Sequence, residues 1–140
     1  MQNLLKTGQL KEHPPDAAEV QRLLAAAARN LADARVTTIS AETRFDAAYR
    51  AITQIGLAAL MLQGYRPDTS RPGHHMTIIR TLMLTLGIEA PRMVVLDTLR
   101  RKRNLADYTG EDIDDASVAA CIAEAEKLLR DAKARLGKRK

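Results

Sequence analysis

Residues 40–64 read SAETRFDAAYRAITQIGLAALMLQG, and this stretch decides the fold. Its apolar side chains recur at the i, i+3, i+4, i+7 spacing, which is typical of one face of an amphipathic helix. Ser40 is a favoured N-cap, and Gly64 is typical of the residue that follows a helix. Gly56 lies within the apolar face, where glycine costs about 1 kcal/mol relative to alanine. We therefore expect a long core helix that a second helix approaches closely at Gly56.

The same periodicity predicts further helices over residues 17–35, 74–86, 91–107 and 116–136. Short connections favour antiparallel packing of helices that follow one another in the chain. The sequence therefore predicts an all-α fold, an antiparallel up-and-down bundle of four to five helices. The buried faces expected for the two middle helices are Ile78, Ile79, Leu82, Met83 and Leu86, and Val94, Val95, Leu96 and Leu99.

Length and composition agree with one helical domain. The chain has 140 residues, of which only 3% are aromatic, and a β fold of this size normally needs more aromatic and β-branched side chains. Residues 1–15 show no clear period and end in two prolines, which indicates an N-terminal leader with one short helical turn at most. We expect the bundle to span residues 16–137, with a basic tail at residues 138–140.

Cysteine content and hydropathy exclude two classes of protein. Cys121 is the only cysteine, so the chain has no internal disulfide and resembles proteins of a reducing compartment. The longest apolar run, residues 56–62, is far too short to cross a bilayer. We therefore expect a cytoplasmic protein that does not associate with a membrane.

The cations are unevenly distributed. The net charge is only +5, but Arg100, Arg101, Lys102 and Arg103 follow one another near the end of a predicted helix. Arg100, Arg103, Asn104 and Asp107 share one face of that helix. A guanidinium such as that of Arg103 can bind phosphate through two hydrogen bonds. The alternative is structural, because cations near a helix C-terminus interact favourably with its dipole and Asp107 can pair with Arg103.

The stretch Arg103-Asn104-Leu105-Ala106-Asp107-Tyr108 resembles the motif of the HEPN superfamily (higher eukaryotes and prokaryotes nucleotide-binding domains). The stretches 44–49 with 64–66, and 73–75, are also similar to segments of such domains, and the resemblance covers roughly residues 16–136. It implies a helical bundle with Arg103, Asn104 and the residue at position 108 at its site. In many members that last residue is histidine, which acts with the arginine in metal-independent ribonuclease chemistry.

Tyr108 occupies the histidine position here, and a phenol with a pKa near 10 exchanges protons poorly at neutral pH. The resemblance therefore implies a domain that binds nucleotide, RNA or a protein partner without catalysis. The first alternative is a ribonuclease that uses Arg103 with Asn104 and Tyr108, or with a histidine from the third helix. The second is a purely structural dimerisation module. Further candidates for nucleic-acid contact are Arg100, Lys102, His74 and His75.

The resemblance also implies a homodimer, and a nucleotidyltransferase-type partner as in toxin–antitoxin or defence systems. We expect no metal and no cofactor. His74 and His75 are adjacent, so on a helix their side chains diverge by about 100° and rarely chelate one ion. Asp114 or Asp115 is expected to cap the last helix, and Cys121 to lie in the core.

Overall fold

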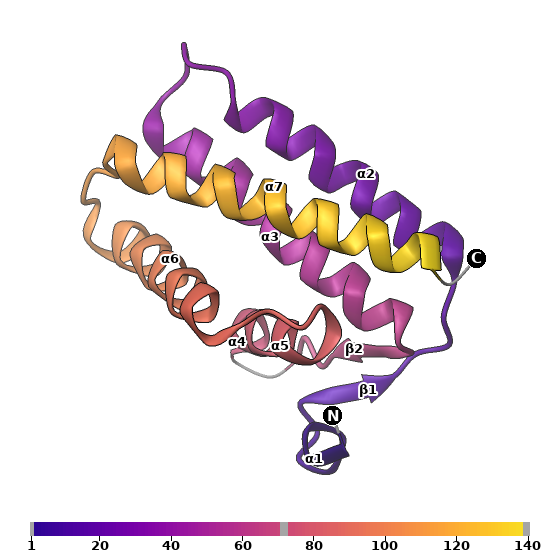
Figure 1. Cartoon of the computed structure of the whole chain (residues 1–140). Helices are drawn as coiled ribbons and strands as arrows, with labels where there is room; N and C mark the ends of the chain where they lie inside the picture. Colours follow the sequence, from indigo (N-terminus) through magenta and orange to yellow (C-terminus); the bar gives the residue numbers. More distant parts are fainter. Residues whose placement is uncertain (1, 71–72, 139–140) are drawn as a thin grey trace.

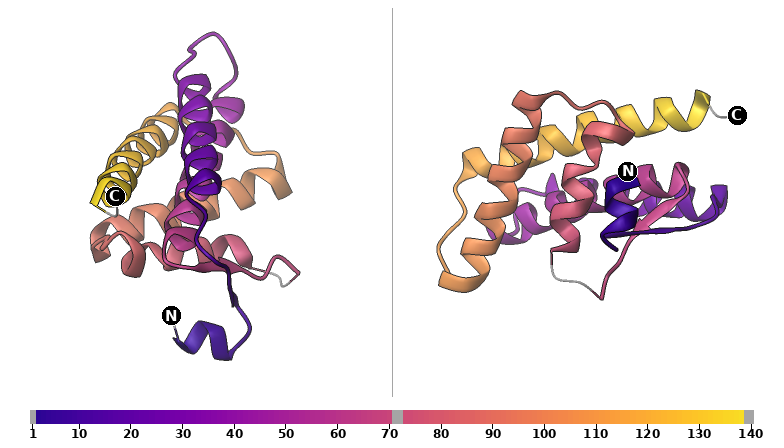
Figure 2. Two further views of the ribbon diagram at one scale, coloured as in Figure 1. Left: turned by 90° about the vertical axis from the view of Figure 1, so that its right-hand side faces the viewer. Right: turned by 90° about the horizontal axis from the view of Figure 1, so that it is seen from below.

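A computed structural model describes residues 2–70 and 73–138, and it confirms an all-α helical bundle (Figure 1). Four long helices form the bundle, and the third of them along the chain crosses the other three at a steep angle instead of lying along them (Figure 2). The four are α2 (Ala17–Ala34), α3 (Ala41–Leu62), α6 (Ala90–Thr109) and α7 (Asp115–Lys138). No helix in the described part of the chain is long and apolar enough to cross a membrane.

Helix α3 is the centre of the bundle, and α2 and α7 pack along it (Figures 1 and 2). Its N-terminus is capped as predicted, because the Ser40 hydroxyl accepts a hydrogen bond from the Thr43 amide at 3.1 Å. The Asp16 carboxylate caps α2 in the same way, at 2.9 Å from the Ala18 amide. The predicted core position of Cys121 is also confirmed. The largest side chains that α3 buries are Phe45, Tyr49, Ile52, Ile55 and Leu60.

Gly56 brings α3 close to α4 (His74–Arg80), as expected. A Cβ atom at position 56 would lie 2.5 Å from Cγ2 of Ile78 and 3.4 Å from its carbonyl oxygen. This methyl group is attached directly to the Ile78 Cβ, and it can move away only if Ile78 leaves the χ1 rotamer that helices strongly prefer or if the helix itself moves. The close approach fixes the position of α4, which begins with His74 and His75.

The single helix predicted over residues 74–86 is divided in the structure. Helix α4 ends at Arg80, and a short helix α5 (Leu82–Thr85) follows. The Thr81 hydroxyl between them donates to the carbonyl oxygens of Thr77 and Ile78, at 2.9 and 3.0 Å. Such bonds from threonine to the preceding turn bend helices. Met83, which follows this division, is 50% exposed rather than buried as predicted.

The segment predicted as a leader contains secondary structure. Residues 2–15 form α1 (Gln2–Lys6) and β1 (Leu10–Glu12), and β1 pairs antiparallel with β2 (Tyr65–Pro67). The Leu10 side chain is only 2% exposed, and it packs with Leu60 and Ile78 in a small second core. The basic tail predicted at residues 138–140 lies outside the described residues, apart from the backbone of Lys138. Gly137, expected to end the last helix, lies within α7.

Candidate functional site

One face of α6 packs against the core, and Arg103 of the predicted site lies on this face. Leu96 and Leu99 are buried on this face, and Arg92 and Arg103 lie on it one turn before and one turn after them. The predicted buried face was partly wrong, because Val94 is 67% and Val95 is 37% exposed. At one end, the Arg92 guanidinium donates to Glu124 and Asp131 of α7, at 3.2 and 3.3 Å. At the other end, Arg103 points to α3.

Arg103 lies over an aromatic ring. Its guanidinium carbon is 5.1 Å from the ring centroid of Tyr49, which is the geometry of a cation–π contact. Its ion-pair distance is long, because Nε lies 3.9 Å from Oδ1 of Asp46, whose side chain is 60% exposed. Such an exposed pair contributes little to stability. Arg103 is therefore held mainly by the ring, and its charge is only partly compensated.

Tyr49 carries a buried hydroxyl. The residue is 2% exposed, and its oxygen has no hydrogen-bond partner among the described residues. Burial raises the pKa of Tyr49 to about 12, although the neighbouring Arg103 acts in the opposite direction. Since an unpaired buried hydroxyl is energetically costly, this group is the kind that a functional site retains.

His75 lies beside this pair. Its ring centroid is 6.3 Å from that of Tyr49 and 4.7 Å from that of His74. Partial burial lowers the pKa of His75, and the positive charges of His74 and Arg103 lower it further. The two histidines line a surface hollow between α4 and α6, which we call the α4–α6 hollow. Its lining residues are Gly73, His74, His75, Met76, Arg100 and Asn104.

The lowered pKa of His75 predicts a pH dependence of stability. Unfolded histidine binds a proton near its ordinary pKa of about 6.5, whereas folded His75 binds it only at lower pH. Protons therefore favour the unfolded chain, so stability should rise with pH between the lowered pKa and about 6.5. The urea concentration at the midpoint of unfolding should accordingly be higher at about pH 7 than at about pH 5.5. His75→Asn should make this increase smaller, and an unchanged increase would contradict the assignment.

The structure brings most of the predicted site residues together, but two lie apart. Arg100, Asn104, His74 and His75 line one hollow, and Arg103 lies next to them over Tyr49. Lys102 points away, because its amine donates to Ser117 and to Asp114, the latter at 3.2 Å. Tyr108 is 90% exposed, and it lines neither the α4–α6 hollow nor the second hollow described next.

The acidic neighbour is a second, smaller hollow on the other side of Arg103. It is lined by Glu42, Phe45, Asp46, Arg103, Ala106, Asp107, Gly110, Glu111 and Ile113. Its carboxylates would repel an anion, so of these two hollows the α4–α6 hollow is the one that suits a phosphate group. Sequence analysis missed Tyr49 and Asp46 as parts of the site. Their spacing of three residues on α3 was visible, but Tyr49 was assigned only to the apolar face.

In the described ranges, residues 2–70 and 73–138, no three side chains of histidine, cysteine, aspartate or glutamate are grouped so that they could hold a metal ion. Comparison with known proteins adds no assignment. The sequence matches no protein-family model, and no curated protein is significantly similar to it. The function is therefore argued from the residues themselves.

Proposed function

We propose that the chain is a HEPN-like domain that binds RNA or nucleotides through a phosphate group in the α4–α6 hollow, without catalysis. The observation that carries the proposal is the grouping of His74, His75 and Arg100 around this hollow, with Arg103 next to them. Arg103 also lowers the pKa of His75, so its charge acts on the hollow.

The hollow has donors that suit a phosphate and a base. Nε and Nη2 of Arg100 both donate to Asp97, at 3.1 and 3.0 Å, so its guanidinium is oriented while part of it faces the hollow. Asn104 is exposed at the rim, where its amide can donate to and accept from a base edge. The few aromatic residues disfavour binding by base stacking, so phosphate contacts must supply most of the affinity.

Arg103→Gln should weaken RNA binding about tenfold, because one charge next to the bound phosphate is lost. The measurement is fluorescence anisotropy of a labelled single-stranded RNA. Arg130→Gln is the matched control, since it removes the same charge from an exposed side chain of α7 that does not line the hollow. The control should change the dissociation constant less than threefold, roughly the effect of one distant surface charge.

Salt dependence gives a second measurement of the same contact. Arg103→Gln should make the slope of log K against log salt less steep by about 0.7 for single-stranded RNA. Equal losses for the two variants would mean that RNA binds through general surface charge. Absence of RNA and nucleotide binding by the wild type would reject the proposal and leave the purely structural module.

A metal-independent ribonuclease is the second candidate, and the position of His75 favours it. His75 lies beside Tyr49 and the charge of Arg103, its pKa is lowered mainly by burial, and a neutral histidine can act as a general base. The test is cleavage of the same RNA in excess EDTA. Cleavage lost in both His75→Asn and Arg103→Gln would support the enzyme, whereas an intact RNA would reject it.

A homodimer is proposed alongside this function, and α6 offers a surface for it. Val94, Leu105 and Tyr108 lie on one outer face of this helix, and they are 67%, 50% and 90% exposed. A second copy of the chain would cover them and place two α4–α6 hollows on one assembly. Sedimentation at tens of micromolar should therefore give a dimer that Leu105→Glu dissociates, and a wild-type monomer would contradict this prediction.

The nucleotidyltransferase-type partner and the toxin–antitoxin role remain proposals that rest on the resemblance.

A further inference from the structure

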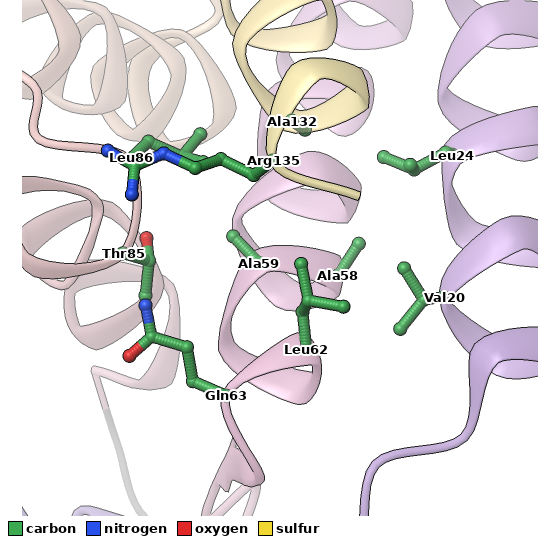
Figure 3. A pocket seen from close by; sticks show the side chains of 10 residues that line it. All are labelled: Val20, Leu24, Ala58, Ala59, Leu62, Gln63, Thr85, Leu86, Ala132 and Arg135. Carbon is green, nitrogen blue, oxygen red and sulfur yellow. The ribbon is translucent and has the colours of Figure 1, made fainter. Parts of the chain in front are cut away.

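A separate cavity lies between α2, α3, α5 and α7, toward the C-terminal end of α3 (Figure 3). Its volume is about 200 Å³. Three alanines, Ala58, Ala59 and Ala132, leave this space where larger side chains would fill the contact between the helices. The remaining lining residues are Val20, Leu24, Leu62, Gln63, Thr85, Leu86 and Arg135.

The polar groups of this cavity lie on one side. Figure 3 shows Gln63, Thr85 and Arg135 on the side of α5, opposite the aliphatic side chains of Val20 and Leu24. A cavity divided in this way fits a molecule with one polar end and one apolar end. Apolar cavities of about 150 Å³ accept a ligand the size of benzene, so the space suits a tail of about six carbons.

Two groups on the polar side can donate to a ligand, namely the buried Thr85 hydroxyl and the solvent-exposed Arg135 guanidinium. The Thr85 hydroxyl is buried, with the residue 2% exposed, and it has no hydrogen-bond partner in the described part of the chain. The Arg135 guanidinium lies at the mouth, where its Nη2 is 3.5 Å from the position that a Cβ on Gly87 would take. Among residues 2–70 and 73–138, no carboxylate forms an ion pair with Arg135.

We propose that this cavity binds a monocarboxylic acid with a short saturated tail. The carboxylate accepts hydrogen bonds from Arg135 and from the Thr85 hydroxyl, and the tail lies against the three alanines. Binding gives the buried Thr85 hydroxyl an acceptor and the exposed Arg135 guanidinium a carboxylate partner, and charge-assisted hydrogen bonds are the stronger ones in proteins. The site shares no lining residue with the α4–α6 hollow, so it stands or fails independently of RNA binding.

The test is a titration of the full chain with hexanoate, followed by amide chemical shifts. Saturable shifts at Thr85, Ala59 and Ala132, with a dissociation constant at or below about 1 mM, would support the site. Arg135→Gln should weaken hexanoate binding at least about tenfold. Arg130→Gln removes the same charge from an exposed position of α7 that does not line the cavity, and it should leave binding unchanged.

Thr85→Val keeps the shape of the side chain and removes the hydroxyl. This variant should weaken hexanoate binding several-fold and affect the binding of hexan-1-ol less. Its melting temperature is measured as the control for folding. Equal affinities of the wild type for hexanoate and hexan-1-ol would overturn the assignment of a carboxylate. Shifts that do not saturate, or that fall outside the cavity, would overturn the site itself.

Discussion

Leu10→Ala is expected to lower the free energy of unfolding by about 2–5 kcal/mol, the range for leucine truncated in a well-packed core. The Leu10 side chain is 2% exposed and packs with Leu60 of α3 and Ile78 of α4. Its removal leaves a cavity at the point where β1 covers the junction of these two helices. The loss can be measured by urea denaturation followed by circular dichroism.

Lys11→Ala is the matched control for Leu10→Ala. Lys11 is the next residue of β1, and its exposed side chain forms only a 3.8 Å ion pair with Asp68. Its truncation should change stability by less than about 0.5 kcal/mol. If both variants were as stable as the wild type, residues 2–15 would be a leader that contributes nothing to the stability of the fold. The expected difference instead makes β1 part of the domain.

The helices were predictable where their periodicity is long. Helices α2, α3 and α7 each repeat apolar residues over many turns, and Ser40 caps α3 as expected. The β1–β2 pair was not predictable, because each strand has only three residues and its partner lies far away in the sequence. Local propensity also could not predict the division after α4, where the Thr81 hydroxyl donates to the carbonyl oxygen of Thr77 in the preceding turn.

The site was predictable as a set of residue types but not as a geometry. The cations of α6 and the histidines of α4 were visible in the sequence, and the structure groups four of them. Lys102 is part of the same basic run, but its amine meets Asp114 at the start of α7, a contact that spacing within one helix cannot reveal. Tyr49 was indistinguishable from a core residue until its hydroxyl was seen to lack a partner.

Gly56→Leu is expected to lower the free energy of unfolding by about 3 kcal/mol, because it adds bulk to a contact that is already close. The first added carbon would meet Cγ2 of Ile78 at 2.5 Å, and the rest of the side chain would push α4 away from α3. His75 follows the first residue of α4, so the same variant should also move it away from Tyr49 and Arg103. Its pKa should then rise toward the ordinary value, which a histidine NMR titration measures directly.

Gly137→Leu is the matched control for this pair of effects. Gly137 lies within α7, and a Cβ there would meet nothing within 4 Å, so the same change should neither destabilise the chain nor shift His75. The double variant Gly56→Leu, Ile78→Ala should lose at least about 1 kcal/mol less unfolding free energy than the sum of the losses in the two single variants. The two side chains compete for the same space, so removing one relieves the clash caused by the other. Additive losses with an unshifted His75 would mean that Gly56 does not position α4. The histidines of the α4–α6 hollow would then be held by contacts other than the close approach of the two helices.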